Sequence, residues 1–356
     1  MRGLRVRRWR VPALPDPSGL AISSRGRLFL GFPRHADDHN MPCLAEIVRG
    51  PDNGTEAVPF PNLDYVLPHG RRRPPSTWLV SPHGMVFDAH DTLWVIDNGK
   101  RASLPGIPEG AAKAVAFDIE HRCVIATFVV PSSIVTNDAH LNDIRADSER
   151  GWIYLTNSGF GPHYSLVVIH MATGRCREFL KNKACTSPEP GFMTFLEGAP
   201  KRLALGSHRS DFPTGGADGI ALSENGSRLY WTPLSGRGLY SIRTRYLHEA
   251  FDADDGDVER WVEYHGQRPT CDGIAEGPHD SLFFGSYQER ALLQRNAKGG
   301  FRLVVQDDDL LGWPDSLVYH DGRLYVTLGQ WDRSAAFNHG TDRRRPPFWV
   351  VCVSIV

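Results

Sequence analysis

Six polar side chains occupy the same position in a pattern that recurs along the chain, each just ahead of a short apolar run. They are Ser18, His83, Asn142, Asp218, Asp272 and Asp315. Carboxyl groups that lie next to one another raise each other's pKa, so one of them keeps its proton near neutral pH. Together with His83 or the nearby His140, such carboxyl groups predict acid–base chemistry that moves protons on a bound small molecule.

The same side chains allow a second chemistry, because carboxylate and amide oxygens with a net negative charge suit Ca²⁺ or Mg²⁺. A structural explanation competes with both. Hydroxyl, amide and carboxylate side chains favour the turns ahead of strands, where they bond to the local backbone. That explanation accounts for one or two of the six positions, so a polar residue in every copy favours a site.

The repeated pattern is clearest at residues 216–232, GADGIALSENGSRLYWT. A small polar step precedes an apolar run, a turn rich in Gly, Asp, Asn or His, and then Leu or Ile beside an aromatic residue. Two apolar runs around such a turn indicate a β-hairpin. Six hairpins predict an all-β repeat array, most simply a six-bladed β-propeller, with six unrelated hairpins in a sandwich as the alternative. The other copies are 18–31, 83–97, 142–157, 272–286 and 315–328.

Further strands follow each copy, which matches the four strands of a propeller blade. The expected third strands are 44–48, 114–118, 166–170, 239–242, 292–295 and 349–353. The expected outer strands include 123–129, 176–180, 258–264 and 301–306. Residues 4–9 alternate like a strand, and we expect them to pair with 349–355, closing the ring as one domain over 1–356. A short helix is expected at 192–197.

The innermost strands of a propeller converge on a central channel, so the six polar residues are expected to ring one mouth of it. His140 and Asp143 lie beside Asn142 in the sequence, and we expect Asn142 and Asp143 to contact a ligand. Aromatic residues that would stack against a flat ligand also fit core positions. These candidate wall residues are Trp78, Tyr287, Trp313, Trp331 and Phe337.

Bulk composition excludes some partners. The 356 residues carry a formal net charge of −1, which gives no general attraction to nucleic acid or to a membrane surface. No apolar run approaches the roughly 20 residues of a membrane span. The N-terminal residues lack the apolar region of a signal peptide, so we expect a cytoplasmic protein, a monomer or weak dimer. The six cysteines show no CxxC spacing and are expected to be thiols, with a bridge between Cys176 and Cys185 as the alternative.

Several motifs together resemble the yellow/major royal jelly protein family. They are the segments 140–145 (HLNDIR), 93–99 (LWVIDNG), 218–223 (DGIALS) and 313–316 (WPDS), followed by 337–338 (FN) and 344–348 (RRPPF). The motifs come in the family's order from about residue 17 to residue 353, and the chain is most similar to the microbial, unsecreted branch. The resemblance implies a six-bladed propeller with a ligand cavity at the channel mouth.

The family resemblance implies several activities. Some insect members resemble dopachrome-converting tautomerases, others bind biogenic amines, and others serve as nutrient or signalling proteins. Gln330 and Trp331 stand where the family more often has Asn followed by Leu, which changes the cavity wall. The chain is also similar, more distantly, to calcium-dependent propellers of the gluconolactonase and regucalcin type. Their first repeat carries a Glu where this chain has Ser18.

Our leading hypothesis is an enzyme that isomerises, tautomerises or cyclises an aromatic or unsaturated metabolite, in a secondary pathway and without a cofactor. His83 or His140 would take a proton, and Asp218, Asp272 or Asp315 would return one. The alternative is a metal-dependent lactonase or esterase in which Asn142, Asp218 and Asp272 hold Ca²⁺. The third hypothesis is a non-catalytic binder of aromatic amines.

Overall fold

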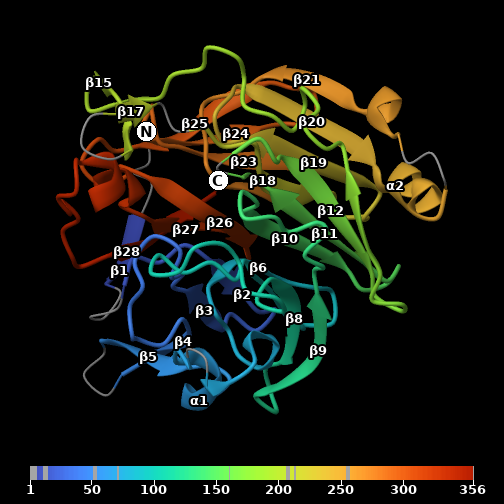
Figure 1. Ribbon diagram of the computed structural model, residues 1–356. Coiled ribbons are helices and arrows are strands. Elements are labelled where there is room, and N and C mark those ends of the chain that lie inside the picture. The colour runs from blue at the N-terminus through green and yellow to red at the C-terminus, as the bar shows by residue number, and fades with distance from the viewer. Residues whose placement is uncertain are drawn as a thin grey trace.

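The computed structural model describes residues 6–10, 15–50, 54–69, 72–159, 161–205, 209–211, 214–253 and 257–355. Within these residues, six four-stranded antiparallel sheets surround a central axis, as Figure 1 shows. Each sheet is one blade, with its strands in order from the axis outward. The six-bladed β-propeller predicted from the repeats is therefore confirmed.

The first three blades follow one another along the chain. Blade one contains β2 (Leu20–Ile22), β3 (Leu28–Gly31), β4 (Leu44–Arg49) and β5 (Thr55–Pro59). Blade two contains β6 (Pro82–Phe87), β7 (Leu93–Asp97), β8 (Lys113–Asp118) and β9 (Cys123–Val129). Blade three contains β10 (Leu141–Asp147), β11 (Trp152–Asn157), β12 (Ser165–His170) and β13 (Cys176–Phe179).

The last three blades repeat this plan. Blade four contains β18 (Ala217–Leu222), β19 (Arg228–Pro233), β20 (Gly238–Arg243) and β21 (Glu263–Gln267). Blade five contains β22 (Ile274–Gly277), β23 (Ser281–Ser286), β24 (Ala291–Arg295) and β25 (Phe301–Gln306). Blade six contains β26 (Pro314–His320), β27 (Arg323–Leu328), β28 (Trp349–Ser354) and β1 (Val6–Arg10).

The N-terminal strand closes the ring, as predicted. Strand β1 pairs antiparallel with β28 along its whole length, from Val6 opposite Val353 to Arg10 opposite Trp349. Residues 4 and 5 of the expected strand lie outside the described residues. This pairing covers the outer edge of β28, which would otherwise offer unpaired backbone groups.

The connections differ from the sequence predictions in two places and contain one hairpin for which no prediction was made. The helix expected at 192–197 is wrong, because β14 (Phe195–Leu196) pairs with β15 (Ala199–Pro200) across Glu197 and Gly198, which both have positive φ and make a tight hairpin turn. Strands β16 (Leu203–Leu205) and β17 (Arg209–Asp211) form a second hairpin. Part of the outer strand expected at 258–264 is instead a 3-10 turn, Glu259–Trp261.

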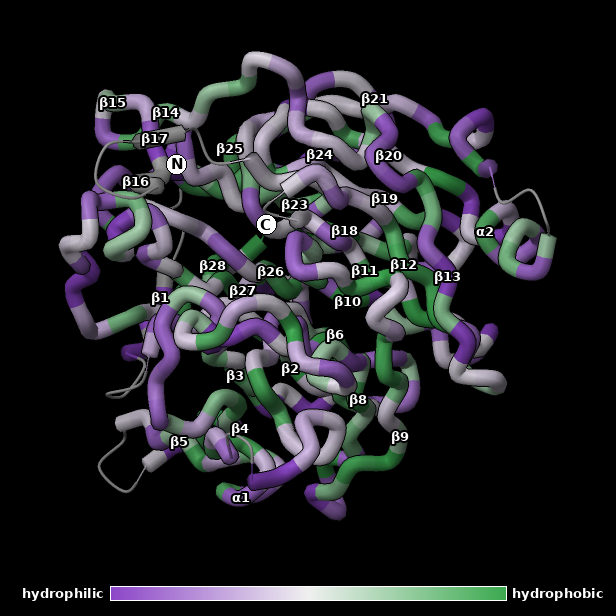
Figure 2. Tube along the Cα trace, in the orientation of Figure 1, coloured by the Kyte–Doolittle hydropathy of each residue, from purple (hydrophilic) through white to green (hydrophobic). Residues whose placement is uncertain are grey.

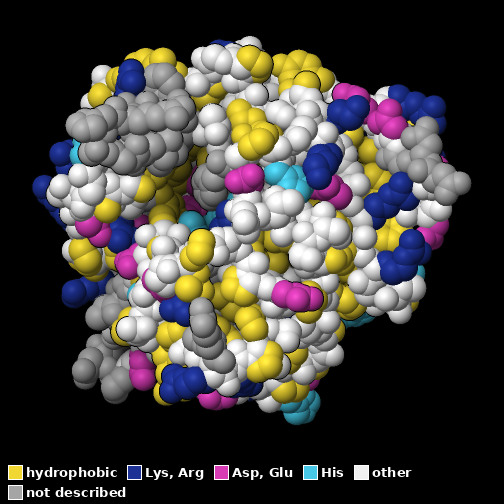
Figure 3. All heavy atoms as spheres, in the orientation of Figure 1, with side chains coloured by type: hydrophobic (Ala, Val, Ile, Leu, Met, Phe, Trp, Pro, Cys, Tyr) yellow, Lys and Arg dark blue, Asp and Glu magenta, His cyan; other side chains and the backbone are white. Residues whose placement is uncertain are grey.

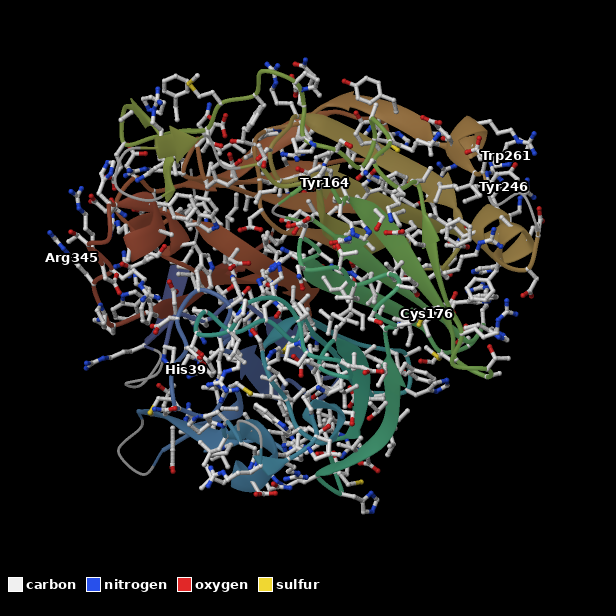
Figure 4. The ribbon with its side chains drawn as sticks, viewed as in Figure 1. His39, Tyr164, Cys176, Tyr246, Trp261 and Arg345 are labelled. Atoms are coloured by element: carbon white, nitrogen blue, oxygen red, sulfur yellow. The ribbon has the colours of Figure 1, made fainter. Side chains whose placement is uncertain are left out.

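The described helices are short. Helix α2 (Thr244–Phe251), which sequence reasoning missed, buries Leu247 and Phe251 against blade four, and its Tyr246 stacks on Trp261 with ring centroids 4.4 Å apart (Figure 4). None of these helices combines the length and apolar character needed to cross a bilayer. The remaining helical segments are α1 (Leu63–Val66) and the 3-10 turns Pro75–Thr77, Trp331–Arg333 and Ala335–Phe337.

All six cysteines are free thiols, so the alternative bridge between Cys176 and Cys185 does not form. Figure 4 shows Cys176 on β13, the outermost strand of its blade. Burial raises the pKa of the Cys176 and Cys185 thiols to about 11 and about 12, so both stay protonated at neutral pH.

Apolar side chains fill the spaces between neighbouring blades. The Leu or Ile and the aromatic residue after each repeat's turn supply much of this core, with Phe29, Tyr154 and Phe283 fully buried. The inner and middle strands are correspondingly the most hydrophobic part of the trace in Figure 2. This packing holds the blades as rigid wedges around the axis.

Glycine allows the inner strands to approach one another closely at the axis. A Cβ on Gly19 would lie 2.1 Å from the backbone oxygen of His83 in the next blade, and one on Gly273 would lie 2.2 Å from that of Asp315. In each case the glycine follows a polar residue of the predicted ring. Similar contacts with the next blade occur at Gly84 and Gly219.

Two blades lack this glycine and use a threonine instead. The Thr156 hydroxyl donates to the backbone oxygen of Asp218 at 2.5 Å, and the Thr327 hydroxyl donates to that of Ser18 at 2.9 Å. The backbone at the polar residue is thus in contact with the preceding blade all the way round the axis.

We predict that Gly273→Ala destabilises the fold by about 1–3 kcal/mol, because the new methyl group would overlap backbone that cannot rotate away. Gly54→Ala is the matched control, since a Cβ there meets nothing within 4 Å. Urea unfolding followed by circular dichroism measures the difference. Equal midpoints for the two variants would show that the blades do not depend on close approach at the axis.

Candidate functional site

The predicted polar residues lie where the inner strands are irregular. In four blades the pairing of the inner strand with its neighbour shifts register across the polar residue, between 82 and 85, 141 and 144, 217 and 220, and 314 and 317. A β-bulge of this kind changes the direction in which a side chain points. The residues inside the four irregular steps include His83, Asn142, Asp218 and Asp315, and all four line one central cavity.

This cavity has a volume of about 260 Å³ and takes side chains from all six blades. Figure 3 shows the hollow on this face, with hydrophobic, acidic and histidine side chains inside it. Five of the six predicted ring residues line it, namely His83, Asn142, Asp218, Asp272 and Asp315. Ser18 lies just beneath, fully buried, with its hydroxyl 3.4 Å from Nε2 of His83.

One side of the floor is acidic. Burial, and then the neighbouring Asp272, raise the pKa of Asp218 well above its ordinary value, and the Ser158 hydroxyl offsets this only in part. Neither buried carboxyl oxygen of Asp218 accepts a hydrogen bond of normal geometry from the described residues. Burial also raises the pKa of Asp272, but Asp218, the Trp313 indole and the buried Arg268 favour its charged form. Asp218 is therefore the protonated member of the pair.

Two tryptophans form the walls above these carboxyl groups. The Trp313 indole N–H donates to Oδ2 of Asp272 at 2.6 Å, and the Trp331 indole N–H donates to Oδ2 of Asp315 at 2.8 Å. Tyr287 stacks on Trp313 with ring centroids 4.7 Å apart and an interplanar angle of 10°. The carboxyl groups thus fix the orientation of the aromatic walls.

The opposite side of the floor carries three histidines, His35, His83 and His140. Their ring centroids are 4.8 to 5.2 Å apart, and one ring nitrogen from each lies within 4.8 Å of the other two. Burial lowers the pKa of all three imidazoles, that of His83 to about 4. The nearby Lys100 lowers the pKa of His35 and His140 further, so the three rings are neutral at pH 7.

One hydrogen bond fixes the tautomer of His83. Nδ1 of this ring lies 3.1 Å from the backbone carbonyl of Asn142. Because a carbonyl oxygen can only accept, Nδ1 carries the proton and Nε2 keeps its lone pair. The lone pair of Nε2 lies 3.4 Å from the Ser18 hydroxyl, which also bonds to Asp315. When that hydroxyl turns to Asp315, Nε2 can accept a proton or bind an ion.

His35 owes its position to a buried arginine beside it. Arg34 is fully buried, and its guanidinium donates to five backbone carbonyls, which include those of Val66, Leu79 and Val80. The backbone N–H of Arg34 donates to the Ser81 hydroxyl at 2.8 Å. These bonds attach the loop between β3 and β4 to the chain leading into β6, and they bring His35 next to His83.

A buried ion pair fixes that same stretch of chain from the other side. Asp97 accepts the backbone N–H groups of Val80 and Ser81, each at 2.7 Å, and its carboxylate also binds Nζ of Lys113 at 2.7 Å. Both charged side chains are fully buried. In blade three, Oδ1 of Asn157 accepts the backbone N–H of His140 at 2.8 Å, at the equivalent end of the second strand.

The structure brings most of the predicted site residues together, and it leaves two elsewhere. Five other predicted residues line the cavity together with the ring residues, namely His140, Tyr287, Trp313, Trp331 and Phe337. Trp78 packs instead under a loop with Val80 and Ala111. Asp143 forms an ion pair with Arg145 at 3.1 Å in a separate cavity, where Glu276 also lies.

Sequence reasoning missed lining residues outside the repeats. His35 and Lys201 come from connecting segments, and Ser158 follows the second strand of blade three. Lys201 pairs with Asp332 at 3.5 Å near the cavity. For His35, the available signal was a histidine next to an arginine in the loop that follows the first repeat, which no periodicity marks.

The architecture and the sequence can be compared with known proteins. Residues 80–345 match the family described as Major royal jelly protein. Major royal jelly protein 5 of Apis mellifera is 22% identical over 275 residues, which are 75% of this chain and 42% of that protein. The chain thus spans less than half the length of this relative.

Solved structures show the same fold at low sequence identity. The luciferin-regenerating enzyme aligns with a TM-score of 0.55 and 12% identity over 99% of this chain and 95% of its own. A gluconolactonase from Xanthomonas campestris aligns with a TM-score of 0.53 and 12% identity over 99% and 90%. The family match covers most of the chain and includes the cavity residues from His83 to Phe337. The chain belongs to the major royal jelly protein family.

Proposed function

We propose that the central cavity is the active site of an isomerase, tautomerase or cyclase that acts on an aromatic or unsaturated small molecule by proton transfer. One observation carries the proposal. The cavity places a carboxyl group that keeps its proton, Asp218, in the same 260 Å³ space as the neutral imidazoles of His83 and His140. An acid and a base held in one desolvated site are what such a reaction requires.

Asp218 is suited to the role of acid. It donates its proton most readily to a substrate atom that gains negative charge. Before the transfer the pair holds one proton and one negative charge, and after it both carboxyl groups are charged. The Trp313 indole and Arg268 stabilise the charge on Asp272. The indole is a fixed hydrogen-bond donor and Arg268 is a fixed positive charge, so little rearrangement is needed when the proton leaves Asp218.

The base is a histidine, and His83 is the better placed of the two. Its Nε2 lone pair accepts a proton from the substrate carbon, while the other proton stays on Nδ1 and is donated in a hydrogen bond to the Asn142 carbonyl. The carbon–hydrogen bond of the substrate breaks, the double bond shifts, and Asp218 protonates the other end. The product is an isomer of the substrate. Loss of a proton from His83 to solvent and gain of one by Asp218 restore the enzyme, so no co-reactant is consumed.

The walls indicate the class of substrate. Trp313, Trp331, Tyr287 and Phe337 line the cavity, and ring stacking against such walls favours a flat, conjugated molecule. The Asn142 side chain would hold a carbonyl or hydroxyl oxygen of that molecule. The family resemblance to dopachrome-converting proteins suggests aminochromes and aryl-substituted keto acids as the first compounds to test.

We predict that His83→Ala and Asp218→Asn each lower kcat by about 10²–10⁴-fold on any compound of that panel that the protein converts, the usual contribution of a positioned acid or base. Product formation is followed by ultraviolet absorbance. The matched controls are His121→Ala and Asp308→Asn, which change an exposed histidine and an exposed aspartate. Unchanged turnover in both site variants would reject the assignment, and tight binding without turnover would favour a non-catalytic binder.

A second prediction concerns stability and needs no substrate. The folded-state pKa of Asp218 is raised above the ordinary 3.8, so the stability that its neutral form supplies is complete below 3.8 and is lost as pH rises through the folded value. Asp218→Asn removes this titration. We expect the variant to match the parent protein near pH 4 and to exceed it by about 1–3 kcal/mol at high pH.

Unfolding in urea at several pH values measures this difference, with Asp308→Asn as the control. A stability difference that stays constant from pH 4 to pH 9 would show that Asp218 does not titrate in the folded protein with a raised pKa.

The second candidate function is a calcium-dependent hydrolase, and one observation favours it. The two buried oxygens of Asp218 accept no normal hydrogen bond from the described residues, which fits a cation ligand as well as a proton. Asn142, Asp218 and Asp272 would hold Ca²⁺, which would polarise a substrate carbonyl and activate water. The donor set is sparse, because Ser18 replaces the Glu of the lactonase type and Trp313 already occupies one oxygen of Asp272.

Removal of divalent ions separates the two candidate functions. If EDTA-treated protein, shown free of Ca²⁺ by elemental analysis, keeps full activity on the converted compound, the hydrolase proposal is rejected. Loss of lactone hydrolysis that only Ca²⁺ restores would support it instead.

A further inference from the structure

We infer that His35, His83 and His140 form a binding site for a divalent transition metal ion, with its open coordination position facing the central cavity. The three imidazoles come from three different blades and meet at one point of the floor. Among the described residues no other group of three histidine, cysteine or acidic side chains converges in this way. The inference goes beyond the proposed function, since it concerns an ion and not the substrate.

The spacing is that of a metal site in its open form. One nitrogen from each ring lies within 4.8 Å of the other two. A tetrahedral ion with metal–nitrogen bonds of about 2.1 Å holds its ligand nitrogens roughly 3.4 Å apart. Small rotations of the three rings therefore bring the nitrogens into coordinating distance, without movement of the blades.

The surroundings of two of the rings suit a metal ligand, for different reasons. His83 donates Nδ1–H to the Asn142 carbonyl at 3.1 Å, which is how proteins usually orient a metal-binding imidazole. The Nδ1 atom of His35 is buried and has no hydrogen-bond partner among the described residues. A buried ring nitrogen without a partner is costly, and a bound ion would satisfy it.

The supporting structure is rigid. The loop that carries His35 is fixed by the five carbonyl bonds of the buried Arg34 guanidinium. The backbone of His140 is fixed by the Asn157 side chain at 2.8 Å. The ligands are thus held near one another before an ion arrives, which lowers the conformational cost of binding it.

The ligand type selects the class of ion. Imidazole nitrogen suits Zn²⁺, Cu²⁺, Ni²⁺, Co²⁺ and Fe²⁺, whereas Ca²⁺ and Mg²⁺ prefer oxygen. Three protein ligands leave a further position for water or substrate, as in catalytic zinc sites. Lys100 opposes a cation here, while Asp218, Asp272 and Asp315 on the same cavity floor favour one.

The metal inference and the proton-transfer proposal can fail separately. Metal binding is measured without any substrate, and turnover is measured on protein shown to be metal-free. If both hold, water on the ion would replace the His83 lone pair as the proton acceptor, and the acid role of Asp218 would be unchanged.

The test is a titration of metal-free protein with Co²⁺, followed by the visible absorption of the bound ion. We expect one equivalent to bind, with the intense bands of a four-coordinate site, and Zn²⁺ to displace it. His35→Ala should weaken binding at least about 10-fold, because one of three ligands is lost. His121→Ala, which removes an exposed histidine, should not change it.

Pulsed EPR of the one-equivalent Cu²⁺ complex of the unmodified protein gives a readout that needs no variant, should His35→Ala fail to fold. Signals from three coordinated imidazoles are expected. Absence of stoichiometric Co²⁺ and Cu²⁺ binding would overturn the inference. So would binding that is lost in His121→Ala and kept in His35→Ala, or a Cu²⁺ complex with a single imidazole.

Discussion

The contact of each inner strand with the backbone of the next, made at the axis, is the constraint on which the rest of the molecule depends. Gly19 and Gly273 pack against carbonyl oxygens of the following blade, and Thr156 and Thr327 reach the equivalent oxygens of two other blades by hydrogen bonds. With the strands this close, their first residues surround one cavity of about 260 Å³. The polar side chains at those positions therefore share one small space, in which most of them are buried.

That shared space sets the protonation of the floor. Carboxyl groups taken out of water hold their protons, and imidazoles taken out of water lose theirs, so desolvation drives the two types toward neutrality from opposite directions. Asp218 and His83 become an acid and a base in one cavity without any ion pair between them. The indoles of Trp313 and Trp331 then orient the carboxyl groups and are oriented by them.

The sequence allowed the blades, the ring closure and most of the floor to be predicted, because each follows from a repeated pattern. His35 and Arg34 could not be found in this way, since they lie in one connecting loop and have no counterpart in the other repeats. Asp143 was misplaced because successive residues of a strand face opposite ways, so that its side chain lies with Arg145 when Asn142 lines the cavity. Trp78 precedes the strand and packs under a loop, which no spacing reveals.

The same constraint explains how one propeller can support different chemistries. The close contacts at the axis are made mainly by backbone carbonyls, glycines and two threonines, to which His83 adds a hydrogen bond from Nδ1 to the Asn142 carbonyl of the next blade. Most of the contact between blades therefore does not depend on which polar side chain stands at a ring position. In this chain the nitrogen donors gather on one side of the floor and the oxygen donors on the other. The choice of side chain at each ring position, and not a change of fold, therefore decides whether the floor presents an acid, a base or ligands for an ion.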